Sequence, residues 1–246
     1  MNRIRLITCK RKMFCFCIVL LIAAQGLPDD THWTEDTNHY SISVYYPASA
    51  LENGAVGEKI KKFASEQIKS FKELFMEYFK DYPLLTEWNL DINFIHEPSP
   101  DSMICILAWM WSYTGGPHGN SWTRAFIFDL SSDSFIGPVE LLGGQTEFES
   151  FVEEVTAQLL EILDDEAYYQ EGAYPTPENY HSVLPVPDEN GGIAGYTVIF
   201  PPYQVACYAR GPVEVYVPAD RTVMYNGRTE YSYGRNRIMW GLTGVN

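Results

Sequence analysis

Two long stretches with the periodicity of an amphipathic helix divide the rest of the sequence into groups of strands. Over residues 58–80, apolar side chains recur every three or four positions, and lysines fill the positions between them. Thr146 and Glu149 form a capping-box pattern ahead of a second such stretch, which ends at Leu163. Each pattern predicts a helix that buries one face and exposes the other.

The segments around these helices have the composition of β-strands. Six runs alternate apolar with smaller residues or are rich in β-branched and aromatic residues: 40–46, 88–95, 103–111, 122–130, 196–200 and 213–217. The order is strand, helix, three strands, helix, two strands, without the regular alternation that builds a parallel sheet. We therefore predict the α+β class: antiparallel sheets each packed by an amphipathic helix, two helices in all, with an antiparallel meander over residues 88–130.

One segment between the predicted strands is long and rich in proline. Residues 172–192 contain four prolines, Pro175, Pro177, Pro185 and Pro187. A loop of this length is unusual in a compact domain, so it either carries function or is mobile.

The first 26 residues have the order of a cleavable export signal. Five lysines or arginines precede an apolar run over residues 13–24, and small residues lie at its end. The run holds 12 residues, whereas a membrane-spanning helix needs about 20. We expect cleavage after Gly26 and a periplasmic or secreted protein without a transmembrane anchor. The predicted organisation is a signal peptide at 1–26, α+β regions at 27–118 and 119–220, and a basic aromatic tail at 221–246.

The predicted mature chain is strongly acidic. It has 12 lysines and arginines against 32 acids, and residues 81–220 hold 22 acids against Arg124 and Arg210 alone. Such a field repels nucleic acid and anionic membranes and speeds encounter with cationic partners. The alternative is that the charge serves solubility.

The sequence gives no sign of a metal site, a cofactor or a disulfide scaffold. The five histidines show no His-x-x-x-His pair, and Asp164, Asp165 and Glu166 lack the glycine and alternating oxygen ligands of a calcium loop. After removal of the signal peptide only Cys105 and Cys207 remain. They either form one bridge in an oxidising compartment or stay separate thiols.

The most specific local motif joins two predicted strands and contains three glycines. It reads Tyr113-Thr114-Gly115-Gly116-Pro117-His118-Gly119-Asn120. Glycines permit positive φ angles and close approach of the backbone to its neighbours. A β-branched residue at Gly116 is expected to be costly if that position has a positive φ.

This loop, with two further motifs, resembles the RsiV-like proteins of the DUF3298 family. The further motifs are Phe128-Asp129-Leu130 and the run FPPYQVA over residues 200–206, followed by Gly211. The resemblance covers about residues 38–218 and implies a DUF4163 or PdaC-like region at 27–118 and a DUF3298 region at 119–220. Family members are sensor or ligand-binding ectodomains: one is an anti-sigma factor whose outer domain binds lysozyme, and another fronts a peptidoglycan deacetylase.

The resemblance and the charge together predict a non-catalytic binding protein. Its partner would be a cationic polypeptide such as a lysozyme, or a cell-wall component such as peptidoglycan. The predicted binding residues are Tyr113, Gly115, Gly116, His118, Asn120 and Tyr203. Tyr203 and Tyr208 are either core aromatics or a stacking platform for a glycan.

Two other functions stay open. The first is a cell-wall hydrolase or deacetylase in which His118 acts as general acid or base, oriented by Asp129 or Tyr203. No Gly-x-Ser-x-Gly elbow or Cys/His arrangement supports it. The second is a structural envelope protein with no small partner.

Overall fold

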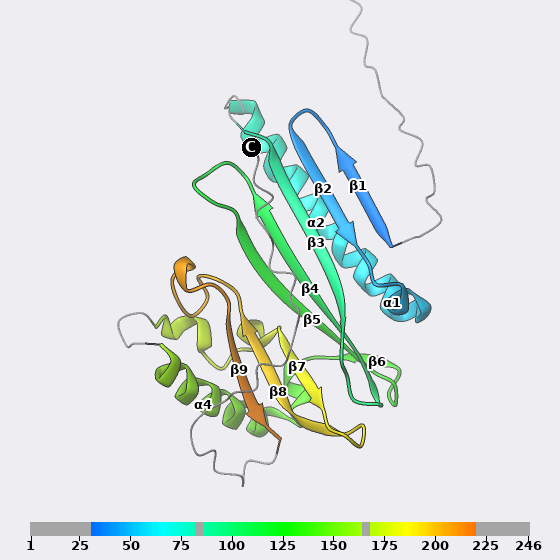
Figure 1. Cartoon of the computed structure of the whole chain (residues 1–246), viewed down its shortest axis with the longest axis vertical. Coiled ribbons are helices and arrows are strands. Elements are labelled where there is room, and N and C mark those ends of the chain that lie inside the picture. Colours follow the sequence, from blue (N-terminus) through cyan, green and yellow to red (C-terminus); the bar gives the residue numbers. More distant parts are fainter. Residues whose placement is uncertain (1–30, 82–85, 164–167, 220–246) are drawn as a thin grey trace, which may run out of the picture. The chain divides into compact units, whose positions relative to one another are not determined.

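The computed structural model describes residues 31–81, 86–163 and 168–219, and Figure 1 shows their arrangement. The predicted signal peptide and C-terminal tail lie outside these residues. The elements of the first sheet and its helices are β1 (His32–Asp36), β2 (Tyr40–Tyr45), α1 (Ala48–Glu52), α2 (Gly54–Asp81), β3 (Trp88–Glu97), β4 (Met103–Tyr113), β5 (Asn120–Asp129) and β6 (Ser134–Ile136). Then follow α3 (Pro138–Leu141), α4 (Gln145–Ile162), the 3₁₀ turns η2 (Gln170–Ala173) and η3 (Pro177–Tyr180), β7 (Val183–Pro187), β8 (Ile193–Phe200), η4 (Tyr208–Arg210) and β9 (Val213–Pro218).

The strands form two mostly antiparallel sheets, so the predicted α+β class is confirmed. One sheet has the order β1-β2-β3-β4-β5-β6 and the other the order β7-β8-β9. The predicted meander is present, because β3 pairs antiparallel with β4 and β4 pairs antiparallel with β5. The β4–β5 pairing joins residues on both sides of position 118, so both predicted regions contribute strands to the first sheet. The division into those regions stays a prediction.

One strand pair is parallel, which the sequence pattern did not predict. β2 runs parallel to β3, with Ile42 opposite Leu90. Parallel neighbours need a crossover connection of a dozen or more residues. The chain between the two strands supplies it as α1 and the 28-residue α2. Two helices are long, as predicted, and the described residues add two short ones, α1 and α3.

The proline-rich segment predicted as a long loop contains a strand. β7 includes Pro185 and Pro187 and pairs antiparallel with β8. Proline cannot donate a ladder hydrogen bond, so it is tolerated in edge strands and depleted in central ones. β7 lies at the edge of its sheet, which explains why a strand can contain these prolines. The same prolines led the sequence pattern to predict a loop.

The predicted capping box at the start of α4 is wrong. The helix begins at Gln145 with Gly144 as its N-cap, so Thr146 lies inside the first turn. Gly143 and Gly144 have φ angles of 99° and 130°. Glycine adopts such angles readily, and the chain therefore enters the helix through a glycine turn in place of a threonine cap.

β4 is buried on both faces and contributes to two hydrophobic cores. Side chains alternate between the faces of a strand. Cys105 and Leu107 belong to a core shared with α4 and the second sheet. Ile106, Ala108 and Met110 belong to a core shared with α2. β5 is divided in the same way, so this strand pair is a wall common to both cores.

Each sheet packs against one of the two long helices, as the amphipathic patterns predicted. Ile60, Ala64 and Phe71 of α2 share one core with side chains of β2, β3 and β4. α4 turns Phe148, Phe151, Val155 and Leu159 toward β8 and β9 in the other. Within the residues described, no helix is long and apolar enough to cross a bilayer.

Cys105 and Cys207 are two free thiols. Cys105 is buried and Cys207 is exposed. Burial raises the pKa of the Cys105 thiol to about 12, and the nearby Glu97 carboxylate adds to the effect. Of the two alternatives that the sequence left open, the structure has separate thiols.

Two neighbouring leucines of α4 test the packing of that helix. Leu159 is 0% exposed, whereas Leu160 is 46% exposed. We expect Leu159→Ala to lower the free energy of unfolding by about 2–5 kcal/mol, since it removes buried methyl groups and leaves a cavity. Leu160→Ala, the matched control, should change it by no more than about 0.5 kcal/mol. Urea denaturation measures the free energy of unfolding of both variants. Equal losses of stability would contradict the orientation of α4 described above.

Candidate functional site

Three aromatic rings from two distant segments meet beside the β4–β5 loop. The His118 ring stacks on Tyr208, with a centroid distance of 3.8 Å and an interplanar angle of 16°. Tyr203 lies 6.2 Å from His118 and 5.5 Å from Tyr208, again between ring centroids. His118 comes from the loop, and both tyrosines come from the connection between β8 and β9. We call these three residues the aromatic cluster.

Hydrogen bonds fix the orientation of the His118 ring. Its Nδ1 lies 2.9 Å from the carbonyl oxygen of Gly119, which can only accept, so Nδ1 carries the hydrogen. Its Nε2 lies 3.3 Å from the Tyr203 hydroxyl. Tyr203 is thus one of the two partners that the sequence suggested for His118.

Asp129, the other suggested partner, lies at the opposite end of β5. Its carboxylate accepts hydrogen bonds from Ser131 and Ser132. These bonds, those from Ser131 first, lower the pKa of Asp129. Asp129 therefore serves the turn between β5 and β6 and does not orient His118.

Tyr203 has a strained backbone that its surroundings hold in place. Its φ angle is 71°, in a region that bulky residues rarely adopt. The next residue, Gln204, donates from Nε2 to the carbonyl oxygens of Gly172 and Asn179, at 2.8 and 2.9 Å. Backbone strain of this kind is concentrated at functional sites. Here it accompanies a tyrosine side chain that is 49% exposed.

The loop glycines have different roles. Gly115 has a positive φ of 81°. A Cβ atom at Gly119 would lie 2.5 Å from the Trp111 indole nitrogen, so this position needs glycine for close packing. Gly116 does not have a positive φ, and the nearest atom to a Cβ there would be 4.0 Å away. The loss of stability expected for a β-branched residue at Gly116 required a positive φ there, so that expectation no longer holds.

The remaining predicted binding residues belong to the same loop and do not join the aromatic cluster. The Tyr113 hydroxyl donates to the Gly116 carbonyl oxygen at 3.0 Å and closes the loop. Asn120 is exposed at the start of β5. Tyr208, which was not among the predicted binding residues, makes the closest ring contact with His118. Its aromatic character was visible in the sequence, but its distance from His118 along the chain gave no sign of the contact.

The C-terminal end of α4 lies next to the segment that carries Tyr203 and Tyr208. Arg210 Nη2 donates to the Ile162 carbonyl oxygen at 2.8 Å, and the Tyr169 amide donates to the Val205 carbonyl oxygen at 2.9 Å. The exposed residues of α4 include Glu147, Glu149, Glu153, Glu154 and Glu161, and the helix has no lysine or arginine. An acidic helix face therefore extends toward the aromatic cluster.

The described ranges contain no group of three or more histidine, cysteine, aspartate or glutamate side chains placed to hold a metal ion. The exposed aromatic rings and the acidic helix face can instead make stacking, cation–π and electrostatic contacts.

Comparisons with known proteins relate this chain to a fold and to part of a longer protein. No protein-family model matches it. It is 21% identical over 150 residues to the peptidoglycan-N-acetylmuramic acid deacetylase PdaC of Bacillus subtilis, a match that covers 59% of this chain and 31% of that protein. The chain thus spans about a third of the length of this curated relative.

Two solved structures are similar to this one. A DUF3298 family member from Bacteroides fragilis has a TM-score of 0.52 and 16% identity, covering 81% of this chain and 93% of the other. A DUF3298 family protein from Pseudomonas aeruginosa has a TM-score of 0.47 and 14% identity, covering 76% and 88%. The first comparison confirms, at the level of the fold, the DUF3298 resemblance expected from the sequence motifs.

Two glycines of the loop give a matched test of its packing. We expect Gly119→Ala to lower the free energy of unfolding by about 1–3 kcal/mol, because the new methyl group overlaps the Trp111 indole. Gly116→Ala has open space and should leave stability unchanged or raise it by up to about 1 kcal/mol, through a less flexible unfolded chain. Thermal and urea unfolding compare the two. A tolerated Gly119→Ala would show that the backbone does not approach Trp111 this closely.

Proposed function

We propose that this chain is an exported, non-catalytic binding protein of the DUF3298 type that recognises a cationic polypeptide. The observation that carries the proposal is the aromatic cluster, in which His118 and Tyr203 are exposed and Tyr208 is half-buried, next to the end of an acidic helix. The export signal, the family assignment and the absence of catalysis are parts of the same proposal.

The aromatic cluster suits the side chains of a cationic polypeptide. Arginine and lysine bind the faces of aromatic rings, with about 0.5–1 kcal/mol for each exposed contact. Tyr203 offers much of its ring to solvent, and its hydroxyl contact with His118 limits its rotation. A side chain that is already ordered loses less conformational freedom on binding.

The charge distribution supports the same choice of partner. The five exposed glutamates of α4 lie along a helix whose C-terminal end is next to the segment of Tyr203 and Tyr208, and residues 81–220 hold 22 acids against two bases. Such a surface attracts a cationic protein over a distance and raises the association rate. Carboxylate-bearing wall fragments would be repelled, so a polypeptide is favoured over peptidoglycan as the direct partner.

The contacts of His118 favour binding over acid–base chemistry. A catalytic histidine is commonly oriented by a carboxylate and bonded to a nucleophile. The His118 nitrogens instead contact a backbone carbonyl and a phenol. The likeness to a peptidoglycan deacetylase supports a place in the cell envelope. It does not carry that enzyme's activity to this chain, because the match covers 31% of the enzyme.

A binding experiment with matched tyrosine variants tests the proposal. Lysozyme serves as the cationic probe, and kinetics are measured with the mature protein on a biosensor surface. Tyr203→Ala should weaken binding by about tenfold, a typical loss for an exposed aromatic anchor. Tyr45→Ala removes a tyrosine that is 50% exposed on β2 and should leave binding unchanged. Raising salt from about 50 to 500 mM should slow association more than it speeds dissociation.

Several outcomes would contradict the proposal. Equal losses in the two tyrosine variants would exclude the aromatic cluster as the binding surface, and salt-independent association would exclude electrostatic steering. Binding of purified peptidoglycan fragments without binding of lysozyme would favour a wall ligand. Release of acetate or of reducing ends from peptidoglycan, lost in His118→Ala, would show an enzyme.

A further inference from the structure

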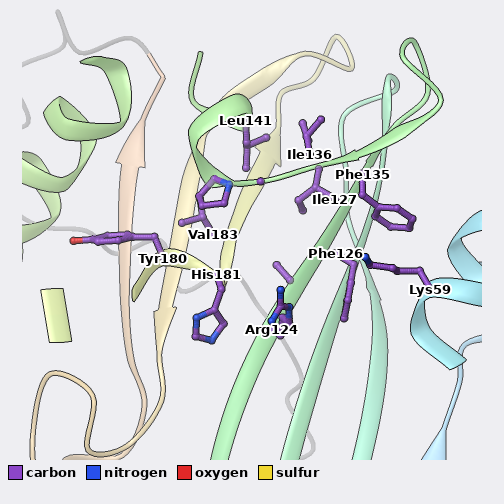
Figure 2. Close-up of a pocket in the computed structure, with 13 residues that line it drawn as sticks. Lys59, Arg124, Phe126, Ile127, Phe135, Ile136, Leu141, Tyr180, His181 and Val183 are labelled. Carbon is purple, nitrogen blue, oxygen red and sulfur yellow. The ribbon is translucent and has the colours of Figure 1, made fainter. Parts of the chain in front are cut away.

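A cavity of about 210 Å³ lies beside β5, where β6 ends. Its lining comes from α2, β5, β6, α3 and the segment around η3, and Figure 2 shows these side chains. β6 pairs with β5 only from Ile127 to Asp129. At Gly137 the chain leaves the sheet and enters α3, so the edge of β5 ahead of Ile127 is not covered by β6.

His181 occupies this open edge in place of a strand. Its carbonyl oxygen accepts a hydrogen bond from the Ala125 amide at 2.9 Å. Its ring nitrogen Nε2 lies 2.7 Å from the Thr123 carbonyl oxygen, and Nδ1 contacts the Glu178 carbonyl oxygen. These contacts to carbonyl oxygens fix the orientation of the ring at the edge of β5.

Two cations line the cavity, and neither has a carboxylate partner among the residues that the structure describes. They are Lys59 of α2 and Arg124 of β5. Over the described ranges the side-chain ion pairs are Lys69–Glu73 and Lys72–Glu35, and neither includes a cavity residue. Arg124 is also one of two bases among residues 81–220. The cavity therefore gathers positive charge within a strongly acidic chain.

Aromatic rings position these two cations. The Lys59 Nζ lies 5.3 Å from the centroid of the Phe135 ring. The Arg124 guanidinium carbon lies 5.9 Å from the ring centroids of Phe63 and Phe126. Contacts of this kind orient a cation while leaving its N–H groups available to an anion.

The other side chains of the described lining are mostly apolar, and none of them is acidic. Ile127, Ile136, Leu141 and Val183 contribute aliphatic surface, and no aspartate or glutamate is among the described lining residues. The nearby Glu140 carboxylate accepts a hydrogen bond from the Gly137 amide at 3.1 Å, at the start of α3. The volume of the cavity is smaller than the ~300 Å³ at which sites for drug-sized ligands begin. The cavity therefore suits a small ligand.

We propose that this cavity is a binding site for a small organic anion, a molecule with a carboxylate or phosphate head and a short apolar group. Arg124 presents a planar pair of donors that fits the oxygens of either head. Lys59 adds positive charge, and the aliphatic lining takes the apolar group. This site is separate from the aromatic cluster and does not depend on the function proposed for it.

Titration with defined probes tests the site in the mature protein. Hexanoate, hexyl phosphate and inorganic phosphate are added up to about 10 mM, enough to fill a millimolar site, and amide NMR shifts are followed. We expect at least one hexyl anion to shift Arg124, Ala125 and His181 amides saturably and more tightly than inorganic phosphate. Comparison of the two hexyl probes identifies the preferred head group. Hexanamide, which has no charge, should bind at least about tenfold more weakly.

Matched lysine variants assign binding to the cavity. Lys59→Gln should weaken binding of the preferred anion several-fold. Lys62→Gln makes the same change in net charge on the same helix but outside the cavity, and it should have no effect. Arg124→Gln should weaken binding most. If this variant does not fold, Lys59→Gln and the comparison with hexanamide still test whether the cavity binds the anion.

Three results would overturn the proposal. They are no saturable shift with any of the three anions, hexanamide binding as tightly as the hexyl anions, and equal weakening by Lys59→Gln and Lys62→Gln.

Discussion

The burial of β4 and β5 on both faces is the constraint on which the rest of the structure depends. Side chains of β4 enter two different cores in alternation, one under α2 and one shared with α4 and the second sheet. A strand buried on both faces reads as a nearly continuous apolar run, and residues 103–111 have that composition. A shift of one residue would exchange the two sets of side chains. The pairing of β3, β4 and β5 is therefore tied to the packing of both long helices.

This strand pair also positions the two sites. The loop before β5 carries His118 to the tyrosines that follow β8, so the aromatic cluster forms where the two sheets' connections meet. Further along β5, the short β6 leaves an open edge that His181 fills, and a cavity remains beside it. Both sites thus arise where the regular pairing of β5 stops. Loops and sheet edges supply polar groups and space that the buried parts of a strand cannot.

The two sites differ in charge in a way that the overall composition conceals. The aromatic cluster lies next to the C-terminal end of an acidic helix, which suits a cationic partner, whereas the cavity gathers Lys59 and Arg124 without a carboxylate among its described lining residues. A net charge describes the long-range field that a partner meets first. Recognition at contact depends on the few side chains that line each site. The two proposals, a cationic polypeptide at the aromatic cluster and a small anion in the cavity, are therefore compatible within one chain.

Hydrophobic periodicity in the sequence determined the two long helices, the meander and the α+β class, because burial of one face imposes a repeat that is visible along the chain. The three glycines of the motif over residues 113–120 also marked the loop that carries His118. Only the tertiary structure decided the parallel pairing of β2 with β3 and the strand that contains the prolines of β7. It alone decided the contacts of His118 with Tyr203 and Tyr208 and the grouping of the cavity cations. These features depend on residues far apart in sequence or on the position of a strand within its sheet, and neither leaves a local pattern in the chain.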